Sequence, residues 1–231
     1  MLLSDSSLGK DFVMPTWSGK QLHLLSPEAT QIEIEDIAHG LAYQCCFNGQ
    51  TRHFYSVAQH SMLVAQLVPA QHRLAALLHE GATAYLGEIA RPLRHLVLEV
   101  QLIEKKIMAA CSEKFGVADF DTPAIRRAHS VALATEYRDL LSHTKKSEDL
   151  AEYSAPVPRR IEAITPEEAK YQFAEMLGKI LDETGAQKSP SASAKHQKGQ
   201  AKTLRAEPSA AATRSCRVFT LPPRFNERRL T

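Results

Sequence analysis

The chain has 231 residues, of which 44% are hydrophobic, 23% are charged and 6% are aromatic. This length suits one domain, or one domain with an appendage, and the composition excludes a collagen, a coiled-coil rod and a fully disordered chain. No stretch approaches about 18 consecutive apolar residues, and the N-terminus lacks the apolar segment of a secretory signal, so no membrane association is expected. The four cysteines are therefore expected to be reduced thiols in the cytoplasm.

The net charge of +2 combines two parts of opposite sign. Residues 185–231 hold ten basic and two acidic side chains, a net charge of +8, whereas residues 1–184 carry a net charge of −6. Residues 185–215 are mostly Ala, Ser, Lys, Gln and Pro, a composition that cannot bury enough apolar surface to offset chain entropy. We therefore predict a folded domain over 1–184 and a disordered basic tail over 185–231. The tail has no aromatic residue before Phe219 and no folded motif, so nucleic acid is not an expected partner.

The first predicted elements are a hairpin and three helices. Residues 16–25 (TWSGKQLHLL) alternate around a Ser-Gly turn, which predicts a small hairpin. Apolar residues recur at helical spacing over 34–47. The next helix is expected to begin at Ser56, because Ser56 with Gln59 three residues later is a capping-box signature. An apolar helix carrying His79 follows over 74–86.

The later part of the domain predicts three more helices. Pro92 suits the first turn of a long helix over 92–115, which Gly116 ends. The Thr-Pro pairs that open residues 122–141 and 165–181 predict the other two. Strand signals are thin elsewhere. The predicted fold class is all-α: a helical bundle with a short irregular or hairpin segment at its N-terminus.

The residues that could carry chemistry are histidines. The sequence contains no GxGxxG after a strand, no GxxxxGK[ST], no GxSxG and no HExxH motif. It does place His60, His79 with Glu80, and His129 on three different predicted helices. Imidazole nitrogens and carboxylate oxygens are natural ligands of divalent transition metals, which helix bundles hold by side chains from facing helices. By spacing alone, core histidines that bind no metal are the more common explanation of such a pattern.

Three stretches of the sequence carry a resemblance to a known family. They cover residues 32–68, 74–93 and 125–141, and they include the segments FYSVAQHS and LLHxxAxAYLG. In this order they resemble the HD-domain phosphohydrolases, in particular small bacterial and phage members related to the 5′-deoxynucleotidases. The resemblance extends from about Thr16 to about Leu141 and implies an HD-domain helical bundle.

The resemblance implies a metal site and a reaction. In that family a divalent metal inside the helical core lowers the pKa of a bound water, which attacks the phosphorus of a nucleotide. Matched by position, the metal ligands are His60, His79, Glu80 and His129. Glu88 matches an acidic family residue and is expected to contact the substrate sugar.

Several matched positions depart from the family's pattern. Glu80 and His129 replace aspartates, Thr83 replaces a glutamate and Cys46 replaces an arginine that grips phosphate. Three histidines and one carboxylate suit Zn²⁺, Fe²⁺, Co²⁺, Ni²⁺ or Mn²⁺ better than Mg²⁺. Thr83 cannot act as a general acid or base at neutral pH, and Cys46 cannot bind phosphate as a guanidinium does.

For some further residues a structural role stands beside the functional one. Arg52 either replaces the missing phosphate-binding arginine or is a solvated surface residue. Glu88 is either a substrate contact or a helix-end carboxylate paired with Arg91 or Arg94. Tyr55 and Tyr85 either line a pocket for the nucleotide base or belong to the core, which is the commoner place for aromatic residues beside helix ends.

Two acidic residues beyond His129 are also candidates. Glu136 and Asp139 either orient metal ligands from behind or form a solvent-facing charged stripe with Arg138. The solvent-facing stripe is the default expectation.

Two functions remain open at this point. The first is a cytoplasmic metal-dependent phosphohydrolase acting on (deoxy)nucleoside monophosphates, with Glu80 and Glu88 as catalytic residues and Arg52 and Glu88 as substrate-binding residues. The alternative is a catalytically silent protein of the same fold that binds a nucleotide or a protein partner. By analogy with the family, a homodimer is compatible with either function.

Overall fold

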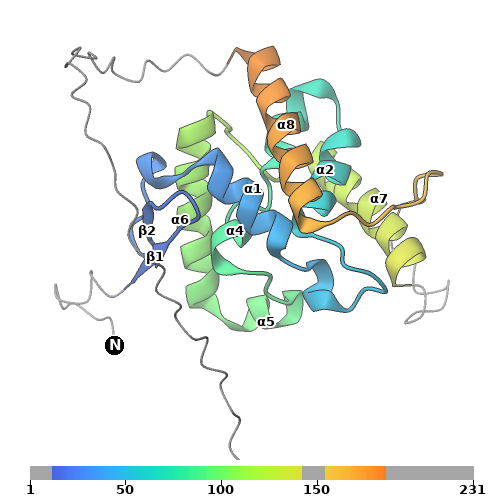
Figure 1. Ribbon diagram of the computed structural model, residues 1–231, viewed down its shortest axis with the longest axis horizontal. Coiled ribbons are helices and arrows are strands. Elements are labelled where there is room, and N and C mark those ends of the chain that lie inside the picture. Colours follow the sequence, from blue (N-terminus) through green and yellow to red (C-terminus); the bar gives the residue numbers. More distant parts are fainter. Residues whose placement is uncertain (1–11, 142–153, 186–231) are drawn as a thin grey trace, which may run out of the picture. The chain divides into compact units, whose positions relative to one another are not determined.

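Helices make up most of the structure, and the all-α character expected from the sequence is confirmed. The computed structural model describes residues 12–141 and 154–185, which belong to a unit formed by residues 1–189. The helices of the described residues are α1 (Ile34–Tyr43), α2 (Val57–Gln66), α3 (Arg73–Leu77), α4 (Thr83–Leu86), α5 (Arg91–Leu96), α6 (Leu98–Phe115), α7 (Pro123–Leu140) and α8 (Pro166–Thr184) (Figure 1). Short 3₁₀ helices lie at Ala29–Gln31, Cys46–Gly49 and Ala70–His72.

The core forms where α1, α2 and α8 meet. α8 contacts α1, α2 and α3, and α1 also contacts α4 (Figure 1). Their inward faces carry fully buried apolar side chains, including Ile37, Leu41, Val64, Phe173 and Leu177. Burying a side chain of this size contributes about 1.5–3 kcal/mol. This packing therefore stabilises the helices that carry the candidate site.

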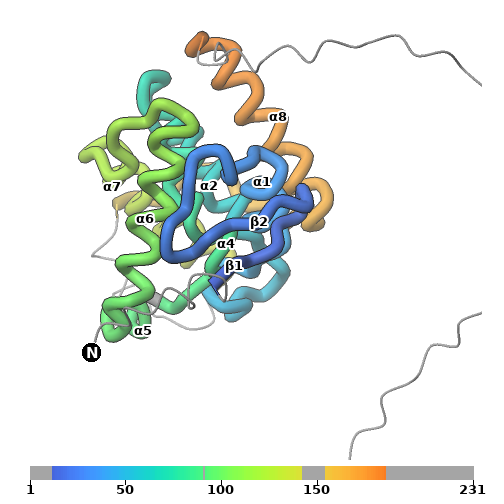
Figure 2. Tube along the Cα trace, turned by 90° about the vertical axis from the view of Figure 1, so that its left-hand side faces the viewer, coloured from blue at the N-terminus to red at the C-terminus, as the bar shows by residue number. Residues whose placement is uncertain are grey.

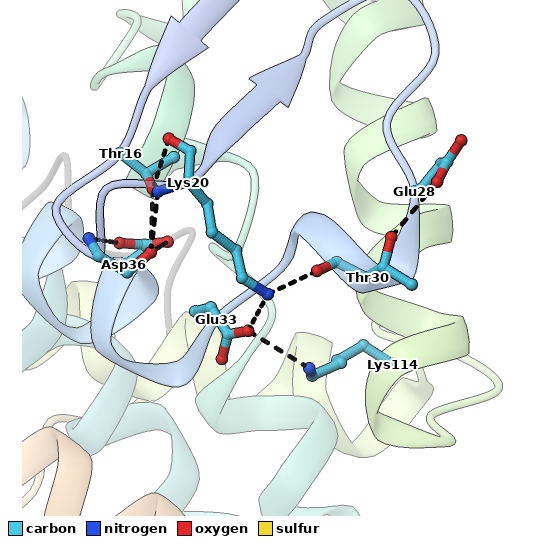
Figure 3. Close-up of polar contacts among 8 residues, drawn as sticks. Thr16, Lys20, Glu28, Thr30, Glu33, Asp36 and Lys114 are labelled. Atoms are coloured by element: carbon cyan, nitrogen blue, oxygen red, sulfur yellow. Dashed lines mark hydrogen bonds and ion pairs between the residues drawn. The ribbon is translucent and has the colours of Figure 1, made fainter. Parts of the chain in front are cut away.

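An N-terminal hairpin is present around the predicted Ser-Gly turn and is tied to α1, but its first strand lies before residue 16, where the hairpin was expected to begin. Strands β1 (Val13–Pro15) and β2 (Gln21–His23) pair antiparallel, and Figure 2 shows them in front of α1. Asp36 of α1 accepts hydrogen bonds from the Ser18 N–H at 2.6 Å and the Ser18 hydroxyl at 2.9 Å. Lys20 donates to the Thr30 carbonyl at 2.7 Å and pairs with Glu33 (Figure 3). The hairpin is thus anchored by polar contacts as well as by its own ladder.

The start of α2 matches the predicted cap only in part. The Ser56 hydroxyl accepts a hydrogen bond from the Gln59 N–H at 3.1 Å, so Ser56 is the N-cap. The Gln59 side chain donates instead to the Glu162 carbonyl at 3.0 Å. Gln59 therefore ties the segment before α8 to α2 and does not complete a capping box.

The helix expected over 34–47 is shorter than predicted. It ends at Tyr43, the chain becomes extended at Gln44, and Cys45 forms an isolated β-bridge with Ser56. This bridge fixes the start of α2 beside the end of α1.

The helix expected over 74–86 is interrupted next to two candidate ligands. α3 ends at Leu77, and His79 and Glu80 lie in the turn before α4. His79 Nδ1 lies 2.7 Å from the Ala76 carbonyl oxygen, the acceptor that the Glu80 N–H would use in a continuous helix. The side chain of His79 thus competes with the helix for this carbonyl.

The helix expected over 92–115 is two helices, α5 and α6. Val97 between them is extended, with φ −114° and ψ 92°. Gln101 Nε2 donates to the Arg94 carbonyl oxygen at 2.8 Å and so takes the acceptor that the N–H four residues on would need in a continuous helix. Gly116 ends α6 in the left-handed conformation, φ 66°, as its position in the sequence predicted.

The last two helices begin where the Thr-Pro pairs predicted. Thr122 caps α7 and Thr165 caps α8, each by accepting a hydrogen bond from the N–H three residues on. α8 continues to Thr184, beyond the expected end near residue 181, and Gly185 closes it with φ 66°. The expected disorder beyond Gly185 lies outside the described residues. Across 12–141 and 154–185, no helix combines the length and apolar character needed to cross a bilayer.

Candidate metal centre

The fold brings the four predicted ligands together. His60 comes from α2, His79 and Glu80 from the turn between α3 and α4, and His129 from α7. One donor atom of each residue lies within 4.8 Å of the donor atoms of the others. The ring centroids of His60 and His129 are 5.0 Å apart, and His79 lies 5.4 Å from His60 and 5.8 Å from His129.

His79 is oriented by the turn that carries it. Its Nδ1–H donates to the Ala76 carbonyl, which leaves the lone pair on Nε2. Nε2 is buried and, among the residues that the structure describes, has no hydrogen-bond partner. Burial lowers the pKa of His79, so the ring is held in the neutral form that binds metals.

His60 is oriented by a buried carboxylate. His60 Nδ1 lies 2.7 Å from Glu136 Oε1, and the Tyr55 hydroxyl donates to the same oxygen at 2.8 Å. Burial alone would lower the pKa of His60, but the Glu136 carboxylate raises it to about 9. Because Nδ1 is engaged with Glu136, Nε2 is the nitrogen left for the cluster. This is the carboxylate–histidine arrangement that supports many metal sites.

The default expectation for Glu136 was therefore wrong. Its side chain is 0% exposed, whereas the sequence favoured a solvent-facing position. The signal for its true place was the seven-residue interval from His129, which puts both residues on one face of α7. Tyr55 likewise uses its hydroxyl on Glu136 and is buried in the core.

Glu80 completes the donor set. Its Oε1 lies 3.6 Å from His79 Nε2, and its Oε2 accepts a hydrogen bond from the Thr83 hydroxyl at 2.7 Å. Burial alone would raise the pKa of Glu80, but His79, His60 and the Thr83 hydroxyl lower it. The carboxylate stays ionised, and three imidazoles with one carboxylate fit a divalent transition metal.

Two further side chains, Glu88 and Cys46, interact electrostatically with the carboxylates of the site. Burial and the negative charge of Glu80 raise the pKa of Glu88 to about 7. Burial, with the carboxylates of Glu136, Glu88 and Glu80, raises the pKa of the Cys46 thiol well above its usual value. Cys46 is therefore a neutral thiol here. Arg94 pairs with Glu104 at 3.1 Å, so the pairing of Arg94 with Glu88 that the sequence suggested is not the one in the structure.

Asp139 belongs to a different network from the cluster. Its side chain is 4% exposed and accepts hydrogen bonds from Arg138 at 2.7 and 2.8 Å and from the Ile161 N–H at 2.9 Å. Arg160 also pairs with it. Asp139 therefore anchors the segment before α8, and its expected place in a solvent-facing stripe was wrong.

The remaining candidates, Arg52 and Tyr85, do not belong to the four-residue cluster. Arg52 is exposed in the loop before α2, and its N–H donates to the Leu140 carbonyl at 3.2 Å. Its role in substrate binding stays a prediction. Tyr85 is buried in the core.

A groove of about 1070 Å³ runs between α2, α8 and residues 157–164. Tyr55 lines it, but none of the four cluster residues does. The groove is therefore not the metal site, although Tyr55 connects the two through its hydrogen bond to Glu136.

Comparison with known proteins places the chain beside two bacterial proteins. No protein-family model matches the sequence. The uncharacterized protein YfdR of Escherichia coli is 40% identical over 125 residues, which cover 54% of this chain and 70% of YfdR. The uncharacterized protein RCAP_rcc00048 of Rhodobacter capsulatus is 36% identical over 154 residues, 62% of this chain and 76% of that protein. At this identity and coverage, the chain belongs to the same protein family as YfdR and RCAP_rcc00048.

Proposed function

We propose that this protein is a cytoplasmic, metal-dependent phosphohydrolase of the HD-domain type, acting on (deoxy)nucleoside monophosphates. The observation that carries the proposal is the cluster of three imidazoles and one carboxylate around the buried, unpartnered Nε2 of His79. Leaving a buried polar atom without a partner costs about 1–3 kcal/mol. A metal ion bound at the cluster would remove that cost.

His60, His79, Glu80 and His129 would hold the metal, with Zn²⁺, Fe²⁺, Co²⁺, Ni²⁺ or Mn²⁺ as the candidates. When bound, such an ion polarises a phosphoryl oxygen and lowers the pKa of water. The resemblance to HD-domain phosphohydrolases supports nucleotides as the substrate class.

The chain's own residues would orient the ligands and move protons. Glu136 fixes the ring of His60 through Nδ1. Glu88 has a pKa of about 7, so its carboxyl group can both accept and donate a proton near neutral pH. We assign to Glu88 the proton exchange with water or the leaving group, and to Arg52 a contact with the substrate phosphate.

A second candidate function follows from Thr83 and Cys46. The Thr83 hydroxyl is engaged with Glu80, and Cys46 is a neutral thiol, so neither supplies a cation or an ionisable acid at neutral pH. These two residues favour a catalytically silent protein of the same fold that binds a nucleotide or a protein partner without hydrolysis.

Metal content and phosphate release, measured on tag-free protein, test both candidates. His79→Ala removes a ligand, and His95→Ala is the matched control because His95 is exposed on α5. We expect about one transition metal per chain in the wild type and the control, and little in His79→Ala. Phosphate release from ribo- and deoxyribonucleoside monophosphates should follow the metal content.

The outcomes separate the candidates. Metal binding without phosphate release from any of these nucleotides would overturn the hydrolase and favour the silent protein. Equal metal content in the wild type and His79→Ala, or no metal after incubation with Zn²⁺, Co²⁺ or Mn²⁺, would overturn the metal centre and the hydrolase, and would favour the silent protein.

A further inference from the structure

The two carboxylate oxygens of Glu80 face different partners. Oε2 accepts the hydrogen bond from the Thr83 hydroxyl at 2.7 Å, whereas Oε1 lies 3.6 Å from His79 Nε2. Only one oxygen is therefore directed toward the histidines. A glutamate side chain loses about 1.5–2 kcal/mol of rotamer freedom when it is fixed, so a partner that fixes it in advance favours ligand binding.

Thr83 is itself held firmly. It is the first residue of α4 and is 4% exposed. Its N–H donates to the Glu80 carbonyl at 2.9 Å, and its own carbonyl accepts from Gln44 Nε2 at 2.9 Å. Because a threonine side chain has few allowed rotamers in a helix, its hydroxyl has a defined direction before any ligand arrives.

We infer that Thr83 is a positioning residue that holds Glu80 as a one-oxygen metal ligand. With Oε2 engaged by Thr83, the protein offers four donors to the ion: three nitrogens and one oxygen. A carboxylate binding through both oxygens would add a fifth donor. Three nitrogens and one oxygen suit Zn²⁺ and Co²⁺, whereas ions that prefer more oxygen ligands are expected to bind this donor set less tightly. The inference rests on the metal-binding part of the proposed function and not on hydrolysis.

Cobalt titration of the metal-free protein tests this role without any measurement of activity. Thr83→Val removes the hydroxyl and keeps the shape, whereas Thr83→Ser keeps the hydroxyl. Thr165→Val is the control, since it removes a threonine hydroxyl that caps α8. We expect Thr83→Val to weaken cobalt binding about 10- to 100-fold and to change the visible absorption bands of bound cobalt. Thr83→Ser and Thr165→Val should keep the wild-type affinity and spectrum.

Each other outcome overturns the inference. Wild-type affinity and spectrum in Thr83→Val would show that the hydroxyl does not position Glu80. An equal loss in Thr83→Ser and Thr83→Val would show that keeping the hydroxyl does not preserve cobalt binding, so the hydroxyl alone does not position Glu80. If circular dichroism shows that Thr83→Val is unfolded, Thr83→Ala and Thr83→Ser decide the same question.

Failure of the proposed function would give results that differ from failure of the inference about Thr83. A wild-type protein that binds no cobalt overturns the metal centre, and the role of Thr83 falls with it. A wild-type protein that binds cobalt but hydrolyses no nucleotide leaves the role of Thr83 intact.

Discussion

Substitution of Gly40 by alanine tests how α1 fixes the position of α4. Gly40 lies within α1, where its Cα approaches the backbone of α4. A Cβ atom built on Gly40 would lie 2.3 Å from the Ala84 carbonyl oxygen and 2.9 Å from two further Ala84 backbone atoms. Ordinary van der Waals contacts are 3.4–4 Å, so α4 would have to retreat by roughly 1 Å.

The expected loss of stability combines two opposing terms. Overpacking of this kind costs about 1–3 kcal/mol, and the upper end applies because the clashing atoms are backbone. Replacing glycine by alanine within a helix by itself stabilises the fold by about 0.5–1 kcal/mol. We therefore expect Gly40→Ala to lower the free energy of unfolding by about 2 kcal/mol, which corresponds to a fall in Tm of roughly 4–8 °C for a domain of this size.

Gly178→Ala provides the matched control in a thermal or urea unfolding assay. Gly178 lies in α8, and a Cβ there meets nothing within 4 Å. Gly178→Ala should therefore raise the stability by about 0.5–1 kcal/mol. If Gly40→Ala is stabilised as much as Gly178→Ala, the close approach of α1 and α4 does not constrain the fold, and the reasoning is refuted.

Four further substitutions give effects of defined sign. Burial raises the pKa of Glu88 from 4.5 to about 7, so its ionisation destabilises the metal-free protein as pH rises from 4.5 through 7. In urea unfolding, Glu88→Gln should therefore raise the free energy of unfolding by about 1–2 kcal/mol at pH 8 but change it little at pH 4. Burial alone would raise the pKa of Asp139, but its hydrogen bonds outweigh burial and lower the pKa to about 2. Asp139→Asn should therefore lower the free energy of unfolding by about 2 kcal/mol at pH 7, and this difference should shrink as pH falls from 4 toward 2. Glu136→Gln should weaken cobalt binding about 10- to 100-fold, and Tyr55→Phe should weaken it less, because His60 keeps its hydrogen bond; unchanged binding in Glu136→Gln would contradict the role of that carboxylate.

Much of the fold could be predicted because local signals determine it. The Thr-Pro pairs at the starts of α7 and α8 and Gly116 at the end of α6 mark helix ends through backbone chemistry that acts within one turn. The four cluster residues could be predicted because matched motifs named them, and the fold brings them within 4.8 Å.

The features that sequence reasoning missed depend on contacts between distant residues. The break after α3 follows from the side chain of His79 taking a backbone carbonyl, a competition that helical periodicity does not reveal. The burial of Glu136 depends on Tyr55 and His60, which lie far from it in sequence. Asp139 is covered by Arg160 and Ile161, from a segment that no periodic pattern placed against α7.

The hydrogen-bond partners of the cluster histidines also explain why the cluster suits a metal ion better than a hydrogen-bond network without one. The Nδ1 atoms of His60 and His79 are already engaged, with Glu136 and with the Ala76 carbonyl. Nε2 of His79 is buried and has no hydrogen-bond partner among the residues that the structure describes, and a buried lone pair without a partner is costly. Glu136 has His60 as its partner, whereas Glu80 brings a further negative charge into a buried region, and burying uncompensated charge costs several kcal/mol per ion. A divalent cation would bind the lone pair of His79 Nε2 and balance the charge of Glu80 at once, whereas a proton on His79 is opposed by burial, which lowers the pKa of that ring.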